Sequence, residues 1–474
     1  MSGDYRLGLK TLDDEIVVDR LPVRGELPSW LAGTLIRNGP AMFDHAGKSF
    51  RHWFDGQAML HRFEFTGGPD GGVSYANRLL DTLNVQSLRE RGRIGYQEFA
   101  TDPCASLFGR FFTRFTRGTS ANGCVNVTEV NGRSLAVSET NLAVQFEPET
   151  LATVGVIRYG PEASGLVTTA HPHAAPGTRD LVNYMLKFGR HSRYVVYRQG
   201  PADAAPTVVG EIPADLPGYV HSFAITEHHV VLAIFPLVVN PLSFLLRNRP
   251  FIDNYRWRPE LGLRIVVLDL VSGTLRADCR APAAFAFHHI NAYEDGNAIV
   301  MDLCAYPDAG IVDVFRLERL RDGEVLPPCR PTRYHIDPDA GTVEVATLVD
   351  QTLDLARINY GRHNGRPYRY AYGCGADQAT SNFFDRLVKL DVTDRTVTVW
   401  REDGCFPGEP VFIAAPGSSA EDEGVVLSVV LDATAGRSSL LVLDARSFTE
   451  LARGDVPHAI PYGFHGQFTR ARPT

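Results

Sequence analysis

The feature that most constrains the fold of this chain is a recurring phrase, in which an apolar run ends in an acidic residue and is followed by a turn and a second apolar run. The phrase occurs five times, centred on Glu147, Asp269, Asp337, Asp391 and Asp444. Each copy predicts one β-hairpin, because turn residues here join two runs rich in β-branched side chains. The acidic residues follow one another at 68, 54 and 53 residues from Asp269 onward, and 122 residues, about two such units, separate the first two.

A hairpin repeated at this interval is typical of propeller blades, whose stacking buries faces that no blade could bury alone. Seven blades with long insertions would fill 474 residues, and the 43 glycines and 30 prolines divide most of the sequence into short strand-like runs. We therefore expect an all-β fold. The repeat alone also leaves open a β-sandwich or an irregular multi-sheet protein. One segment differs, because residues 105–115 place apolar side chains at helical spacing.

Charge and cysteine usage exclude several classes of protein. The net charge is −8 and no basic run is present, so a nucleic-acid partner is not expected. The seven cysteines are scattered and form no C-x-x-C pair, which argues against a disulfide framework and a zinc ribbon and favours a reducing cytoplasm. The N-terminal residues lack the basic start and apolar core of a secretion signal.

The most apolar stretch, residues 230–246, is interrupted by Pro236, Asn240 and Pro241. It is shorter than the roughly 20 apolar residues that a membrane-spanning helix needs. We expect it to touch a membrane surface at most.

Four of the fifteen histidines stand in distinctive segments: His171 (TTAHPHAAP), His221 (GYVHSFAIT), His288 (FAFHHINAYED) and His465 (PYGFHGQF). Their intervals of 50, 67 and 177 residues correspond to about one, one and three blades. This phasing predicts that separate blades send one imidazole each to a common axis, although a single histidine on an apolar strand is more often an ordinary core residue. Four neutral imidazoles suit iron(II) and leave two positions of an octahedral centre free.

Uncharged ligands leave the metal's full positive charge in place unless nearby carboxylates compensate it and fix the tautomer of each ring. Glu139, Asp354 and Glu409 lie in strand-like settings and are candidates for this role, although each alone is more often a surface carboxylate.

Two other metal sites were weighed. A two-histidine, one-carboxylate triad could begin with His335 and Asp337, but Asp337 occupies the acidic position of the hairpin phrase, so a turn role explains it. The pair His171 and His173 needs further ligands. The G-x-S-x-G elbow and the glycine-rich phosphate loops are both missing, which leaves nucleophilic catalysis and nucleotide binding without support.

At these residues the sequence resembles the carotenoid cleavage oxygenase family, and within it the branch of the animal β-carotene oxygenases and the retinoid isomerase. The resemblance covers nearly the whole chain. It is carried by LAGTLIRNGPAMF (31–43), HWFDGQAMLHRFEF (52–65), DPC (102–104), SETN (138–141), TAHPH (169–173), VHSFAIT (220–226), FHHINAYED (287–295), INYGRHNGRPYRYAYG (358–373), EDEGVVLSVVLD (421–432) and YGFHG (462–466).

The resemblance implies one domain, residues 1–474, that forms a seven-bladed β-propeller with a loop and helical cap over one axial Fe(2+). The iron ligands would be His171, His221, His288 and His465. The family's outer glutamates match Glu139 and Glu409, whereas Asp354 stands where the family usually has glutamate, so its hydrogen bond to a ligand ring is expected to be longer or water-mediated. Ser138 takes the place of a threonine beside the open side of the iron.

The activity implied is oxidative cleavage by O₂ of a conjugated carbon–carbon double bond in a carotenoid or apocarotenoid, giving two carbonyl products. Phe287, Tyr293 and Phe464 are candidates for the lining of a substrate tunnel.

Residues 105–115 and 235–246 are candidates for an apolar rim that touches a membrane, which would make the protein cytoplasmic or peripherally membrane-bound; the alternative is that both segments pack inside the domain. A retinoid isomerohydrolase, a stilbenoid-cleaving dioxygenase and a non-catalytic lipid-binding propeller stay open as other functions.

Overall fold

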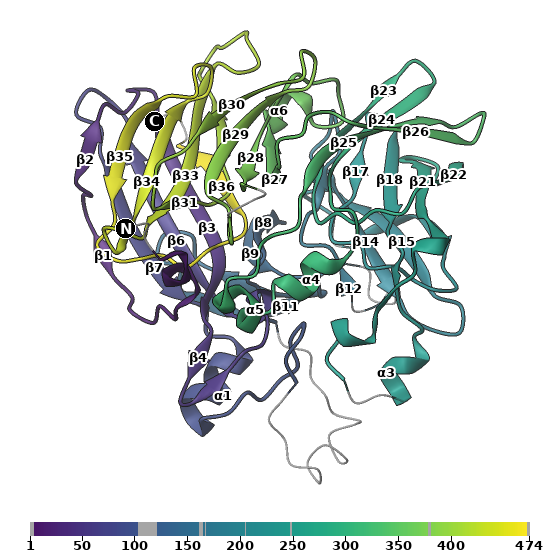
Figure 1. Cartoon of the computed structure of the whole chain (residues 1–474), viewed down its shortest axis with the longest axis horizontal. Helices are drawn as coiled ribbons and strands as arrows, with labels where there is room; N and C mark the ends of the chain where they lie inside the picture. The colour runs from purple at the N-terminus through teal and green to yellow at the C-terminus, as the bar shows by residue number, and fades with distance from the viewer. Residues whose placement is uncertain are drawn as a thin grey trace.

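The computed structural model describes residues 4–102, 121–160, 165, 167–203, 205–246, 249–377 and 381–471, and it arranges seven antiparallel sheets as the blades of a β-propeller (Figure 1). The all-β, seven-bladed prediction is confirmed. We number the blades by the order of their main strands along the chain.

The first four blades contain the following strands in spatial order. The first has β1 (Val17–Val18), β7 (Val73–Leu79), β6 (Gln57–Thr66), β3 (Ala32–Met42) and β36 (Gly466–Arg470). The second has β11 (Thr153–Arg158), β10 (Leu142–Phe146), β9 (Arg133–Val137) and β8 (Asn126–Val130). The third has β12 (Val167–Thr168) and β13 (His173–Ala174), both paired with β14 (Leu181–Lys187), then β15 (Arg193–Gln199) and β16 (Thr207–Pro213). The fourth has β17 (Ala224–Ile225), β18 (His229–Ile234), β21 (Leu263–Asp269) and β22 (Leu275–Ala281).

The last three blades and two small sheets complete the described strands. The fifth blade has β23 (His289–Asp295), β24 (Ala298–Ala305), β25 (Arg330–Asp337) and β26 (Thr342–Thr347), and the sixth has β27 (Asp354–Ile358), β28 (Tyr370–Gly375), β29 (Arg386–Asp391) and β30 (Thr396–Trp400). The seventh has β2 (Val23–Gly25), β35 (Glu450–Asp455), β34 (Arg437–Asp444), β33 (Gly424–Asp432) and β31 (Cys405–Pro407), with β32 (Val411–Ala414) also on β33. The small sheets pair β19 (Leu237–Val238) with β20 (Arg256–Trp257) and β4 (Asp44–His45) with β5 (Lys48–Ser49).

Both ends of the chain close the ring. The C-terminal strand β36 pairs with β3 in the first blade, and the N-terminal strand β2 pairs with β35 in the seventh. Each of these two blades therefore contains strands from opposite ends of the sequence, and Figure 1 shows the N- and C-terminal colours side by side. The first and last blades cannot separate without breaking these ladders.

The recurring phrase forms the outer hairpin of its blade in each case. In four copies the acidic residue is an aspartate whose Oδ1 accepts backbone N–H groups two and three residues later, as Asp269 does from Val271 and Ser272 at 3.0 and 2.7 Å. A short side chain can close this turn on its own backbone. Asp337 is one of the four, so its predicted turn role is confirmed.

Short helices collect on one face of the ring, at the lower side of Figure 1. They include α1 (Leu83–Arg91), α3 (Leu242–Leu246), α4 (Gly310–Val314) and α5 (Leu317–Asp322), whereas α6 (Tyr360–His363) lies on the opposite face. Single 3₁₀ turns span Tyr5–Leu9 (η1), Trp53–Asp55 (η2), Ile252–Asn254 (η4) and Pro259–Leu261 (η5). The helical pattern expected over 105–115 lies outside the described residues.

The apolar segment 235–246 divides into two parts. Phe235, Leu237 and Val239 are buried in the main hydrophobic core and Val238 is buried as well, so a surface rim over these residues is wrong. They are buried because β19 pairs with β20 and Tyr219 donates a backbone bond to Leu237. The second part reaches the surface, where Leu242 is 59% exposed. Among the described helices, none combines the length and the apolar character needed to cross a bilayer.

Ring closure predicts a strong effect of one methyl group. A Cβ on Gly39 in β3 would lie 2.3 Å from the Cα of Gly463, two residues before His465. We expect Gly39→Ala to lower the free energy of unfolding by about 1–3 kcal/mol, because the backbones must move apart. Urea unfolding checks this. Gly155→Ala, where a Cβ meets no atom within 4 Å, is the control, and equal losses in both variants would contradict the interpretation.

Candidate metal centre

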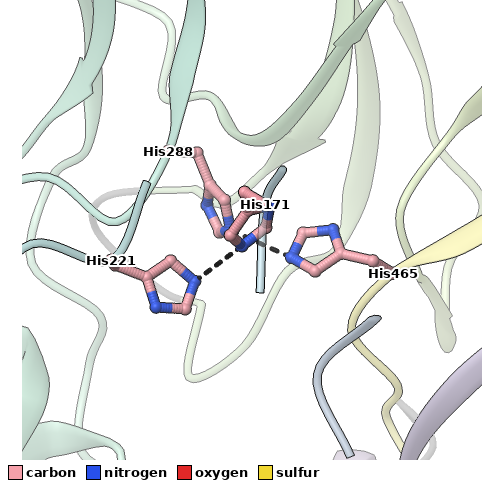
Figure 2. Close-up of side chains that lie close together, drawn as sticks. All are labelled: His171, His221, His288 and His465. Atoms are coloured by element: carbon pink, nitrogen blue, oxygen red, sulfur yellow. Dashed lines mark hydrogen bonds between the residues drawn. The ribbon is translucent and has the colours of Figure 1, made fainter. Parts of the chain in front are cut away.

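Four histidines converge on one point of the propeller axis (Figure 2). Three of them stand just before a strand at one edge of their blade: His221 before β17 in the fourth, His288 before β23 in the fifth and His465 before β36 in the first. His171 lies between β12 and β13 in the third blade. Along the chain the four therefore step by one, one and three blades, which is the order that their spacing predicts.

The four rings are packed closely enough to share one ion. One ligand nitrogen from each lies within 4.8 Å of the others. The Nε2 atoms of His171 and His221 are 3.0 Å apart, and those of His288 and His465 are 3.2 Å apart. Metal–imidazole bonds of about 2.1 Å put neighbouring nitrogens of an octahedral centre about 3 Å apart. The spacing therefore fits adjacent ligands of one metal.

Three carboxylates fix three of the rings from outside. Glu139 Oε1 lies 2.6 Å from His221 Nδ1, and Glu409 Oε1 lies 2.6 Å from His465 Nδ1. Asp354 Oδ1 lies 2.7 Å from His288 Nδ1. An ionised carboxylate only accepts hydrogen bonds, so each of these Nδ1 atoms carries the proton.

This tautomer makes the centre suitable for a cation. His288 and His465 both present an Nε2 lone pair, and the two lone pairs face each other at 3.2 Å without a proton to share. Burial lowers the pKa of His465 to about 4 although Glu409 acts in the opposite direction, so this ring is neutral near pH 7. Burial and the neighbouring imidazoles also hold the pKa of His171 well below its usual value. The donor set therefore fits a metal site.

Asp354 makes a direct hydrogen bond, which corrects the expectation of a longer or water-mediated one. Its side chain is one methylene shorter than glutamate, but a bulge in β27 shifts the register between Asp354 and Arg357. Within the bulge Leu355 adopts φ +51°, and its N–H donates to Asp354 Oδ1 at 2.8 Å. We attribute the direct contact to this local backbone shape.

The groups that hold the carboxylates were not recognised from the sequence. Glu409 is buried between Arg37 and Arg357 and also accepts the Gly466 N–H at 3.0 Å. Although burial raises the pKa of Glu409, Arg357, His465 and Arg37 together hold it well below its usual range. Two phenols hold the other carboxylates: Tyr219 donates to Glu139 at 2.8 Å and Tyr306 donates to Asp354 at 2.6 Å. Two features of the sequence could have pointed to them: Arg37 lies inside the RNGP motif, and Tyr219 lies two residues before His221.

A cavity of about 850 Å³ leads to the four histidines. Its wall includes His221, His288 and His465 together with ten phenylalanine and tryptophan side chains: Trp53, Phe54, Phe99, Phe188, Phe244, Phe251, Phe287, Phe315, Phe384 and Phe464. Phe287 and Phe464, expected in a tunnel wall, both line it, and Ser138 does too. Cavities of this size and apolar character are typical small-molecule sites.

Tyr293 does not line this cavity. It lies five residues beyond His288 on β23, about 16 Å along an extended strand. Its ring packs against Tyr368 and under the guanidinium of Arg333. The assignment of Tyr293 to the tunnel is therefore wrong. Tyr293 is close to His288 in the sequence, but the extended strand places its side chain away from the cavity.

The other candidate metal residues lie elsewhere. Asp337 closes the turn after β25, and His335 sits within β25 opposite Glu344 of β26. His173 Nε2 lies 2.9 Å from the Phe223 carbonyl and its Nδ1 3.0 Å from the Tyr360 hydroxyl. Within the described residues, the group with metal-ligand spacing is the set of four histidines.

Comparisons with known proteins agree with this architecture. The family profile described as Retinal pigment epithelial membrane protein matches residues 9–470. A mitochondrial carotenoid-cleaving dioxygenase of Mustela putorius furo is 33% identical over 97% of this chain and 95% of its own, and a chloroplastic carotenoid cleavage dioxygenase 8 homolog B of Oryza sativa subsp. japonica is 36% identical over 94% and 81%. The crystal structure of the cobalt-substituted apocarotenoid oxygenase ACO of Synechocystis superposes with a TM-score of 0.89 at 27% identity, covering 98% of both chains.

Proposed function

The chain belongs to the carotenoid cleavage oxygenase family, and we propose that it is an iron(II)-dependent dioxygenase that cleaves a conjugated carbon–carbon double bond of a carotenoid or apocarotenoid into two carbonyl products. The observation that carries the proposal is the set of four converging imidazoles at the end of an aromatic cavity. We assign His171, His221, His288 and His465 as ligands of one Fe(2+).

Iron(II) in such a site would bind and polarise O₂, which reacts poorly with a polyene on its own. The residues of the chain do the rest. His221, His288 and His465 keep their Nε2 lone pairs toward the centre because Glu139, Asp354 and Glu409 hold the Nδ1 protons. The three carboxylates also compensate the positive charge that neutral ligands leave in place. One oxygen atom for each of the two product carbons accounts for both atoms of O₂.

The cavity wall supports a polyene as substrate. Phe54 and Phe287 pack edge to face with ring centroids 5.5 Å apart, and Phe287 lies 5.3 Å from the His221 ring. A flat conjugated chain can lie between such rings without leaving polar groups unpaired. Because the wall fixes the chain relative to the histidines, it decides which double bond reaches the metal.

Shortening Phe287, a wall residue whose ring packs against the His221 ring, should lower catalytic efficiency. We expect Phe287→Ala to reduce kcat/KM by about 5- to 30-fold, since roughly 1–2 kcal/mol of apolar contact is lost. Steady-state product analysis by chromatography measures this. Tyr293→Phe serves as the control because Tyr293 lies outside the wall, and we expect it to leave kcat/KM unchanged. A loss with Tyr293→Phe equal to that of Phe287→Ala would contradict the assignment of the wall.

Access from a membrane surface is part of the proposal. Leu242 of α3 lines the cavity and is 59% exposed, which supports entry of an apolar substrate at this point.

The six described cysteines are all buried free thiols, which supports a reducing cytoplasm. We also propose that residues 1–474 act as one domain, since β2 and β36 tie both ends to the ring.

The decisive experiment follows products with and without metal and oxygen. Chelator-treated protein is reloaded with Fe(2+) and incubated with carotenoids, apocarotenals and resveratrol under ¹⁸O₂, and products are identified by mass spectrometry. We expect labelled carbonyl products from a carotenoid or apocarotenal. Turnover of a retinyl ester without O₂ would indicate an isomerohydrolase instead, and cleavage of resveratrol alone would indicate a stilbenoid-cleaving enzyme.

A further inference from the structure

Of the three carboxylates around the centre, Asp354 has the shortest side chain. Glu139 and Glu409 also accept from the Nδ1 of a histidine, but their side chains have one more methylene. Its contact with the ring is nevertheless direct, at 2.7 Å against 2.6 Å for the other two. The bulge at Leu355 brings the carboxylate within reach of His288, and the orientation of the carboxylate then depends on what holds its second oxygen.

The second oxygen of Asp354 is held by one phenol. Tyr306 donates its hydroxyl to Asp354 Oδ2 at 2.6 Å. Both side chains are buried, and Tyr306 is held at its backbone by two bonds with Phe285 at 3.1 and 2.7 Å. Because burial raises the pKa of Tyr306 well above its usual value, the hydroxyl keeps its proton and remains a donor.

The phenol and the histidine belong to the same blade, while the carboxylate belongs to the next. Tyr306 follows β24 and His288 precedes β23, both in the fifth blade, and Asp354 begins β27 in the sixth. The Cys304 N–H donates to the His288 carbonyl at 3.0 Å, so the two segments of the fifth blade are themselves joined beside the site. Both carboxylate oxygens of Asp354 are therefore hydrogen-bonded to side chains of the fifth blade, Oδ1 to His288 and Oδ2 to Tyr306.

Tyr306 reaches the ligand rings through the carboxylate, and its hydroxyl also lies beside the buried Cys329 thiol, which is not a partner of the four histidines. Tyr219, the other phenol, lies 3.3 Å from His221 Nδ1 as well as beside Glu139, so it touches a ligand ring directly. Tyr306 has its ring packed against Phe287, with centroids 6.2 Å apart, and its hydroxyl on Asp354. We propose that Tyr306 is a positioning residue, whose hydroxyl aligns Asp354 with His288 and thereby sets the metal affinity of the centre. This inference rests on the proposed binding of a metal by the four histidines.

The fold offers a matched control for this hydrogen bond. Tyr368 donates to Asp302 Oδ2 at the same distance, 2.6 Å, and both of these side chains are buried. Asp302 faces Arg333 in β25 and is not a partner of the four histidines. Tyr368→Phe therefore removes a phenol–carboxylate bond of equal length without touching the centre.

The experiment uses Co²⁺ as the probe, with the full-length chain. Chelator competition gives its dissociation constant in the wild type, Tyr306→Phe and Tyr368→Phe, and visible absorption of the bound Co²⁺ reports on ligand geometry. We expect Tyr306→Phe to raise the dissociation constant by about 3- to 10-fold and to change the spectrum at saturation, because losing a direct outer partner of a ligand imidazole costs about 10- to 100-fold and Tyr306 acts one hydrogen bond further out. Tyr368→Phe should change neither.

Each outcome decides between the alternatives. An unchanged dissociation constant in Tyr306→Phe, or an equal rise in Tyr368→Phe, overturns the role of Tyr306 while the wild type still binds Co²⁺. A wild type that binds no Co²⁺ overturns the proposed function itself. If Tyr306→Phe does not fold, Tyr306→Met replaces it, since methionine fills much of the volume of the ring and has no proton to donate to Asp354. The same rise is then expected, and an unchanged constant would again overturn the role.

Discussion

His288→Ala is expected to abolish turnover while the protein stays folded. The variant removes one of four metal ligands, and a bound metal contributes several kcal/mol of transition-state stabilisation, so we expect a loss on the order of 10³-fold or more in kcat/KM. The propeller should persist, because its ladders and the closure by β2 and β36 do not involve this side chain. Metal content by mass spectrometry, product yield and circular dichroism measure the three effects separately.

His335→Ala is the matched control, since His335 lies within β25 and outside the centre. It should retain both metal and turnover. If His288→Ala were folded, free of metal and still active, the assignment of the reaction to the four histidines would have to be given up. If the wild type bound apocarotenoid without ever turning it over, a lipid-binding propeller would be the better interpretation.

Glu409→Gln is expected to cause the largest loss of stability among single substitutions at the site. Glu409 is fully buried and faces the buried Arg37 and, at 3.4 Å, Arg357. Removing one charge of a buried ion pair leaves the other uncompensated, which costs roughly 3–5 kcal/mol. The same change removes the partner that holds the His465 proton, so metal affinity should fall about 10- to 100-fold.

Urea unfolding of the metal-free protein and metal titration measure the two losses of Glu409→Gln independently. Asp302→Asn is the control, because Asp302 is equally buried and pairs with Arg333 away from the histidines. It should lose stability but keep metal affinity. Unchanged stability in Glu409→Gln would show that the two arginines need no counter-charge.

The depressed pKa of Glu409 also gives the sign of a pH effect. A carboxyl whose pKa is lower in the folded than in the unfolded protein stabilises the fold above its unfolded pKa of about 4.3 and loses that contribution as the pH falls through the folded value. The difference in stability between wild type and Glu409→Gln should therefore be largest near neutral pH and shrink in strong acid.

Local and periodic features of the sequence were enough to predict the hairpins and to select the four histidines. The aspartates that close outer hairpins, such as Asp269 and Asp444, act on backbone only two and three residues away, so their effect is readable from the chain. The four histidines could be selected because they repeat in step with the blades. Strand-like settings made Glu139, Asp354 and Glu409 candidates, and the motif resemblance then supported them.

Contacts across the axis depended on the tertiary structure. Glu139 of the second blade meets His221 of the fourth, and Arg37 near the N-terminus meets Glu409 near the C-terminus. Such partners are set by how whole sheets pack and by the closure of the ring, and no local pattern encodes them. The same reason explains why Tyr293, close to His288 in sequence, lies outside the cavity wall.

By itself, then, the sequence indicated the hairpin units and the histidines that repeat in step with them, because short-range turn chemistry and a regular spacing carry that information, and its resemblance to a known family implied the seven blades. Only the folded ring decided which carboxylate holds which imidazole. It also decided that the bulge at Leu355 lets the short side chain of Asp354 reach His288, and that the Tyr306 hydroxyl donates to Asp354. These depend on distances between segments that are far apart in the chain, and those distances exist only once the first and last blades have closed on each other.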